Sequence, residues 1–165
     1  LMGRYPRRLS AWFDAEEDVT AARSALAVVG AAPLEARIFA TLSVGEQQRV
    51  AIAAALAQDP AALLLDEPTA NLDLAAQVAV YDLLRDMSRA RRVSILAVTH
   101  DISLAAMYCD RVALLDGGRI AACGPPAEVL RPEILTRIFG TPVAVATHPT
   151  SGTPVVLPVP GGAPR

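Results

Sequence analysis

Two acidic residues stand side by side at the end of an apolar stretch. Asp66 and Glu67 follow the run Ala62–Leu65, in which every residue is apolar. A short run of this kind predicts a buried strand of a parallel sheet, and such sheets collect ligand-binding groups at the carboxyl ends of their strands. One carboxylate could hold Mg²⁺, directly or through its water, and the other could orient or deprotonate an attacking water. Two solvated acids at an ordinary strand end are the simpler interpretation.

A second candidate site lies at the start of a predicted helix. The sequence LSVGEQQR covers residues 42–49 and places Ser43 three residues before Glu46, which is the spacing of a capping box. A serine cap followed by Gly45 leaves backbone N–H groups at the positive end of the helix dipole, where an anion is favoured. Taken alone, the segment is equally well interpreted as a capped helix without a ligand.

Two further polar residues follow the acidic pair. Asn71-Leu72-Asp73 comes a few positions later, and His100 ends the apolar run Val93–Thr99, which predicts the next strand. Because the carboxyl ends of parallel strands meet at one edge of the sheet, Asp66, Glu67 and His100 are expected to converge there. A lone histidine is usually structural, but one beside an acidic pair is placed to meet phosphate.

The elements that must position these residues alternate between helices and strands. A capping box formed by Asp14 and Glu17 predicts a first helix that ends near Gly30. Further helices are predicted over residues 43–58, 74–90 and 102–109, and strands over residues 62–65, 93–99 and 111–115. This alternation predicts an α/β fold with a parallel sheet and helices on its faces.

The last third of the chain carries turn signals. Asp116-Gly117-Gly118-Arg119 predicts a hairpin into a strand over 120–123, and Pro126 and Pro132 predict the first turns of two short helices. A second hairpin is predicted around Thr150–Thr153, between strands over 143–146 and 155–157. We expect these hairpins to add antiparallel edges to the sheet. The Pro/Gly-rich tail over 158–165 is predicted to be disordered.

Composition excludes several classes of protein. Of 165 residues, 53% are hydrophobic and 19% charged, which excludes a disordered chain and a coiled coil. All fifteen basic residues are arginines and seventeen residues are acidic, so the net charge of −2 gives no broad cationic surface for nucleic acid or membrane. Without a lysine, the chain cannot contain a G-x-x-x-x-G-K-[ST] P-loop. Cys109 and Cys123 lack metal-ligand spacing, which favours a cytoplasmic protein.

Four of these segments together resemble the motifs of the ATP-binding cassette (ABC) ATPases. LSVGEQQR resembles the signature sequence, ALLLDEPT (62–69) the Walker B motif with its catalytic glutamate, NLD (71–73) the D-loop, and VTHD (98–101) the switch histidine. They stand in the family's order and at comparable spacing. Val44 is a departure, because the family usually has glycine there, and it bears on how tightly nucleotide is contacted.

The resemblance implies a division of labour between two copies. In this family, two cassettes sandwich two ATP molecules, each bound by the P-loop of one copy and the signature of the other. Ser43 and Gly45, with Glu46 beside them, would contact the γ-phosphate held by the partner. Asp73 would communicate across the dimer.

The resemblance also implies the roles of the strand-end residues. ATP and Mg²⁺ are the implied cofactors, and Asp66 would serve Mg²⁺ in its own copy. Glu67 would polarise the attacking water, and His100 would hold the γ-phosphate. The implied catalytic residues are therefore Glu67 and His100.

The resemblance implies a P-loop NTPase-like (RecA-like) fold that is incomplete. The family's P-loop and glutamine-bearing loop should precede the helical portion, and neither is present in the chain. Residues 1–58 resemble part of the helical subdomain with the signature, and residues 59–157 part of the catalytic lobe with Walker B, D-loop and switch histidine. The tail takes residues 158–165. We expect this chain alone to be inactive as an ATPase because it lacks a P-loop.

The ends of the chain resemble importers of iron chelates, haem and cobalamin. The opening LMGRYP, Gly140-Thr141-Pro142 and the hairpin over 148–158 carry this likeness. It implies an ATP-hydrolysing subunit at the cytoplasmic face of the membrane, bound peripherally. Its partners would be a second ATPase subunit in a homodimer, membrane permease subunits and, indirectly, a substrate-binding protein, with no nucleic acid.

Two alternatives remain open. One is an ABC-type ATPase of DNA maintenance or repair. Such proteins split their lobes with long coiled coils, and no sustained heptad pattern precedes Ser43. The other is an inactive product of a truncated gene.

Overall fold

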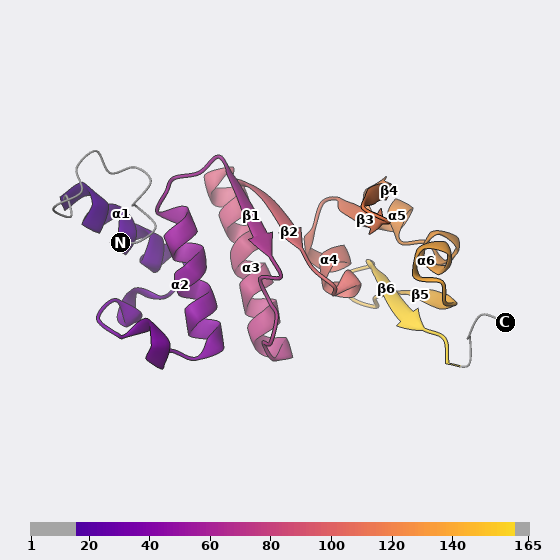
Figure 1. The fold of residues 1–165 in the computed structure, drawn as a ribbon, viewed down its shortest axis with the longest axis horizontal. Coiled ribbons are helices and arrows are strands. Elements are labelled where there is room, and N and C mark those ends of the chain that lie inside the picture. Colours follow the sequence, from indigo (N-terminus) through magenta and orange to yellow (C-terminus); the bar gives the residue numbers. More distant parts are fainter. Residues whose placement is uncertain (1–15, 161–165) are drawn as a thin grey trace. The chain divides into compact units, whose positions relative to one another are not determined.

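The computed structural model describes residues 16–160, and these form two compact units, divided between Val98 and Thr99. The first unit contains α1 (Glu16–Val28), the 3₁₀ turns η2 (Ala32–Leu34) and η3 (Phe39–Thr41), α2 (Val44–Leu56), β1 (Ala62–Asp66), α3 (Leu74–Arg91) and β2 (Ser94–Val98). The second contains α4 (Ile102–Tyr108), β3 (Val112–Asp116), β4 (Arg119–Gly124), α5 (Pro126–Val129), α6 (Pro132–Phe139), β5 (Val143–Thr147) and β6 (Pro154–Pro158). Figure 1 shows both sets of elements. The functional division expected at residue 58 stays a prediction.

Local chemistry sets the ends of the helices in the first unit. Ser43 caps α2 with a complete capping box, as its sequence predicts. Arg92 ends α3 in the left-handed conformation, with φ of 54°, and Asp59 turns the chain after α2 with φ of 50°. The capping role predicted for Asp14 falls outside the described residues.

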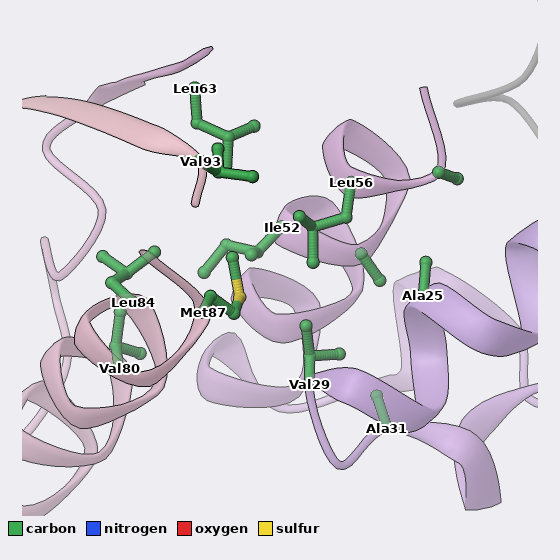
Figure 2. Packing of buried hydrophobic residues seen from close by; sticks show 12 residues of the cluster. Ala25, Val29, Ala31, Ile52, Leu56, Leu63, Val80, Leu84, Met87 and Val93 are labelled. Atoms are coloured by element: carbon green, nitrogen blue, oxygen red, sulfur yellow. The ribbon is translucent and has the colours of Figure 1, made fainter. Parts of the chain in front are cut away.

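The core of the first unit lies between its three helices. Figure 2 shows Ile52 and Leu56 of α2 between Ala25 of α1 and the side chains of α3, among them Met87. Ile52 is only 1% exposed. Leu63, Val93, Val29, Ala31, Val80 and Leu84 complete the labelled cluster. The three helices therefore bury their apolar faces against one another.

The parallel sheet of the first unit is buried on one face only. β1 pairs with β2 in the register Leu64 with Leu96 and Asp66 with Val98. Leu63 is 4% exposed, whereas Leu64 is 77% and Leu96 63% exposed. The buried strands predicted from the apolar runs are therefore covered on one face only among the described residues, and their other face exposes apolar side chains. Successive side chains point to opposite faces of a strand, and within the described residues the helices cover only the face that carries Leu63.

The second unit contains two antiparallel hairpins. β3 pairs with β4, and β5 with β6. In the described residues these pairs are separate two-stranded sheets, not edges of the β1–β2 sheet as the sequence suggested. The predicted Gly117-Gly118 turn is confirmed, with φ of 54° and 75° at the two glycines. Both short helices begin at the predicted prolines.

The hairpins of the second unit pack around a small core of their own. Leu130 and Leu135 are its most deeply buried members, at 1% and 0% exposure, and Ala106 of α4 and Leu114 of β3 contribute to the same cluster. The hydroxyl of Ser103 in α4 accepts a hydrogen bond from the backbone N–H of Val156 in β6. None of the helices within residues 16–160 is long and apolar enough to cross a membrane.

Candidate functional site

The acidic pair occupies the carboxyl end of the parallel sheet. Asp66 is the last residue of β1, and Glu67 follows it with φ of 44°, in the left-handed region that a non-glycine residue adopts only at a cost. The backbone N–H of Glu67 donates to the carbonyl oxygen of Val98 at 2.9 Å. This hydrogen bond ties the turn to the end of β2. Both acidic residues are exposed.

The turn after the acids is compact and buried. Pro68 is among the most deeply buried residues, and Thr69 is 5% exposed. The backbone N–H of Ala70 donates to the carbonyl oxygen of Glu67 at 3.0 Å, and Asn71 takes the left-handed conformation with φ of 59°. The conformation of Glu67 is therefore imposed from both sides, by the strand pairing before it and by a packed turn after it.

Asp73 has a local structural role. One of its carboxylate oxygens accepts a hydrogen bond from the backbone N–H of Ala76 at 2.8 Å, which caps α3. Asp73 is exposed at this position. Its communication across a dimer stays a prediction.

The signature segment forms the N-terminal turn of α2. The hydroxyl of Ser43 accepts from the backbone N–H of Glu46 at 3.3 Å, and the Glu46 carboxylate accepts from the backbone N–H of Ser43 at 2.8 Å. Val44 is 53% exposed. A Cβ placed on Gly45 would lie 3.9 Å from Cδ2 of Leu72, so the start of α2 adjoins the turn that carries Asn71-Leu72-Asp73. The two motifs are thus neighbours in the first unit.

Hydrogen bonds shift the titration of Glu46. The backbone N–H of Ser43, followed by its hydroxyl, lowers the pKa of Glu46 below the ordinary value of 4.5. Burial opposes this, and the charges of Arg37 and then Arg49 each lower the pKa by less than burial raises it. The carboxylate is consequently ionised at neutral pH. The first turn of α2 carries a full negative charge at the same end that its dipole makes attractive to anions.

Two sets of hydrogen bonds at the signature segment were not predicted from the sequence. Arg37 donates from Nη1 to Glu46 at 3.2 Å and from Nη2 to the carbonyl oxygen of Thr41 at 3.2 Å. The side-chain amide of Gln47 donates to the carbonyl oxygen of Phe39 at 3.1 Å. These bonds tie η3 and the segment before it to the start of α2. An arginine nine residues before an acid has no recognisable spacing, so only the fold brings the two together.

His100 belongs to the second unit. It is exposed and comes two residues after Val98, the register partner of Asp66. Immediately after it, the Asp101 carboxylate caps α4 by accepting from the backbone N–H of Leu104 at 2.9 Å. The convergence of His100 with Asp66 and Glu67 stays a prediction.

The carboxylates suit a magnesium ion that is held mostly by other groups. No cluster of three or more His, Cys, Asp or Glu side chains within residues 16–160 is arranged to bind a metal. A magnesium ion at a nucleotide usually takes one or two protein carboxylates together with waters and phosphate oxygens. The exposed Asp66 at the end of β1 could supply one such carboxylate. Carboxylate oxygens are hard, anionic ligands of the kind that Mg²⁺ prefers.

Known proteins resemble this chain along nearly its whole length. Residues 6–70 match the sequence model of the family described as ABC transporter. The hemin import ATP-binding protein HmuV of Nocardia farcinica is 49% identical over 96% of this chain and 54% of its own length. The cobalamin import ATP-binding protein BtuD of Halobacterium salinarum is 40% identical over 96% of this chain and 39% of its own length.

A solved structure supports the same grouping. A putative metal-chelate type ABC transporter in an inward-facing conformation matches with a TM-score of 0.87 and 29% identity, over 96% of this chain and 64% of its own. The fold is α/β, and its motif-bearing turns are those that resemble the motifs of the ABC ATPases. The chain resembles a portion of the ATP-binding domain of the ABC transporter family. It spans about half the length of the N. farcinica relative.

Proposed function

We propose that this chain is part of the ATP-hydrolysing subunit of an importer for hemin, cobalamin or a related metal chelate. The relatives described above are named as hemin and cobalamin import proteins, and the structural neighbour as a metal-chelate transporter. Their names favour transport over the DNA-maintenance alternative. The net charge of −2 agrees with this, because proteins that bind nucleic acid usually present a basic surface.

The observation that carries the catalytic part of the proposal is the conformation of Glu67. Its left-handed backbone is bonded across the strand ends to Val98 and is followed by a buried turn. Strained residues held by their surroundings are concentrated at active sites. The Glu67 carboxylate would orient the attacking water and accept its proton, and Asp66 would hold Mg²⁺ in the same copy. Bound Mg²⁺ would neutralise charge that develops on the phosphates.

The signature segment supports binding in trans. Ser43 and Gly45 present the N-terminal turn of α2, where the dipole favours a phosphate oxygen, and Glu46 completes the cap. A phosphate held by the P-loop of a second subunit is the proposed ligand of this turn. His100 would bind the γ-phosphate of the nucleotide in its own copy. Asp73, at the turn beside Gly45, would couple the two sites.

The proposal places the protein in a complex. Two ATPase subunits pair around nucleotide and act on membrane permease subunits at the cytoplasmic face, with a substrate-binding protein contacting the complex indirectly. The ATPase subunit itself binds the membrane only peripherally. Closure of the pair on ATP and opening after hydrolysis would shift the permease between states, through the different affinities of those states for nucleotide.

Glu67→Gln tests the catalytic proposal. The experiment uses a restored chain, in which the P-loop portion of the N. farcinica relative precedes residue 1 of this chain. The amide keeps the shape of the side chain and removes the base, so ATP hydrolysis should fall by at least about a hundredfold while nucleotide binding is retained. Glu35→Gln is the matched control, because Glu35 is an exposed glutamate remote from the β1–β2 strand ends along the chain. Undiminished turnover in Glu67→Gln would remove Glu67 from catalysis.

A further inference from the structure

The start of α2 contains an electrostatic conflict. The Glu46 carboxylate lies at the helix end that would receive a phosphate, and it accepts the backbone N–H of Ser43 at 2.8 Å. An anion that approaches Ser43 and Gly45 therefore meets a like charge in the same turn, which disfavours binding. The capping box stabilises the helix but works against the proposed ligand.

Arg37 is the cation in contact with this carboxylate. It approaches Glu46 at 3.2 Å, with 47% of the arginine side chain and 23% of the glutamate side chain exposed. Arg49 also acts on Glu46 by its charge, but its Nη1 lies 4.0 Å from a Cβ placed on Gly30, which is at the end of α1. No hydrogen bond or ion pair between Arg49 and Glu46 is present in the described residues. Arg37 is therefore the positive charge that directly contacts the Glu46 carboxylate.

We propose that Arg37 is a positioning residue for nucleotide, which neutralises Glu46 and thereby allows the N-terminal turn of α2 to accept a phosphate. This inference rests on the proposed function. The guanidinium is always charged and presents a rigid fork of donors, one arm on Glu46 and the other on the carbonyl of Thr41. The hydrogen bond to Thr41 fixes the position of the Arg37 guanidinium relative to the N-terminal turn of α2.

A simpler role for Arg37 would be structural. Its bond to Thr41, with the bond from Gln47 to Phe39, holds η3 against α2, and loss of these bonds would disturb the turn whatever the charge of Glu46. The two roles make different predictions for Glu46→Gln. The neutral amide needs no counter-charge, so it should rescue a variant without Arg37 only if charge is the reason that Arg37 matters.

The experiment is a double-mutant cycle in the restored chain. Arg37→Met, Glu46→Gln and their combination are compared by the concentration of Mg²⁺ and a non-hydrolysable ATP analogue that produces half-maximal dimer in analytical ultracentrifugation. Arg23→Met is the control, because Arg23 also forms a surface ion pair, with Glu35 at 2.8 Å, although that pair is more exposed. Thermal melts of all variants report whether the fold is retained.

We expect Arg37→Met to raise the required nucleotide concentration about tenfold, because hydrogen bonds to charged groups are strong and an uncompensated carboxylate repels phosphate. The double variant should return to within about threefold of Glu46→Gln alone, since the coupling is confined to one contact pair. Arg23→Met should leave dimerisation unchanged. NMR titration should show the pKa of Glu46 rising in Arg37→Met.

The outcomes separate this inference from the proposed function. If the restored chain without substitutions fails to dimerise on nucleotide, the proposed function fails and the inference fails with it. If it dimerises and Arg37→Met dimerises equally well, the inference alone is overturned. A double variant as weak as Arg37→Met, even with a normal melt, also overturns it, because the effect would then come from the bond to Thr41.

Discussion

Leu63 and Leu64 are adjacent residues of β1 on opposite faces of the sheet. Leu63 belongs to the core of the first unit and is 4% exposed, while Leu64 is 77% exposed beside Leu96. Leu63→Ala and Leu64→Ala make the same chemical change on the two faces of the sheet, in the chain as it stands and in the restored chain. Comparing their costs shows what stabilises each face.

The expected magnitudes follow from burial. Leucine to alanine removes three carbons, worth about 0.8 kcal/mol each when fully buried, or about 2.4 kcal/mol. Leu63 is almost fully buried, so the transfer and cavity contributions together should cost about 2–5 kcal/mol. Less than a quarter of Leu64 is covered, so its truncation should cost roughly 0.6 kcal/mol or less in the chain as it stands.

Urea unfolding followed by far-ultraviolet circular dichroism measures these free energies of unfolding. We expect a P-loop lobe placed before residue 1 to cover the exposed face. The cost of Leu64→Ala should then rise above about 2 kcal/mol in the restored chain, as for a buried leucine. Leu63→Ala is the internal control and should cost nearly the same in both proteins.

Two results would refute this reasoning. Equal costs for Leu63→Ala and Leu64→Ala in the chain as it stands would mean that something other than the described helices already covers Leu64. A small cost for Leu64→Ala in the restored chain would mean that the P-loop lobe does not pack on this face, and the incomplete-domain interpretation would lose its main structural consequence.

Four other predictions concern single measurements. The chain as it stands should show no measurable ATPase and only millimolar-order affinity for Mg·ATP by calorimetry, roughly 4 kcal/mol, because it lacks the P-loop that supplies most phosphate contacts; micromolar binding would contradict this. The folded-state pKa of Glu46 is lowered, so the stability that the Glu46 carboxylate contributes is present above about pH 4.5 and is lost as the pH falls through the folded pKa. Thermal melts from pH 6 to 3 should show this loss of stability, and the loss should be smaller in Glu46→Gln. Burial, with a smaller effect of Asp110, raises the pKa of Cys109, so iodoacetamide at pH 8 should label exposed Cys123 first, and equal labelling rates would contradict that order. Val44→Gly in the restored chain should leave nucleotide-dependent dimerisation unchanged or tighten it, because Val44 is 53% exposed, and a clear weakening would show that Val44 packs productively.

Local sequence signals predicted the ends of elements well. The capping box at Ser43, the glycine pair at 117–118 and the prolines that open α5 and α6 all have the predicted structures. Each of these signals acts within four residues, through a hydrogen bond or a restricted backbone angle. Tertiary packing therefore has little opportunity to override it.

Predictions from the sequence were incomplete where burial or strand pairing depends on residues far away in the chain. The apolar run Ala62–Leu65 correctly predicted a parallel strand, but burial depends on what packs against each face, and the described helices cover only one. Likewise, the apolar strand β3 pairs only with β4 among the described residues, although its sequence resembles that of a strand in a larger sheet. The contact between Arg37 and Glu46 has no local signature at all.

The candidate site combines structural and functional roles in the same side chains. Ser43 and Asp73 cap helices, and each belongs to a motif that the proposed mechanism uses. Removing a cap costs about 0.5–2 kcal/mol of stability by itself, so alanine at either position confounds loss of fold with loss of function. Glu67 differs, because its proposed role rests on its left-handed backbone and its exposure. Conservative substitutions at Glu67, and paired substitutions at Arg37 and Glu46, therefore separate chemistry from folding where single truncations of the capping residues cannot.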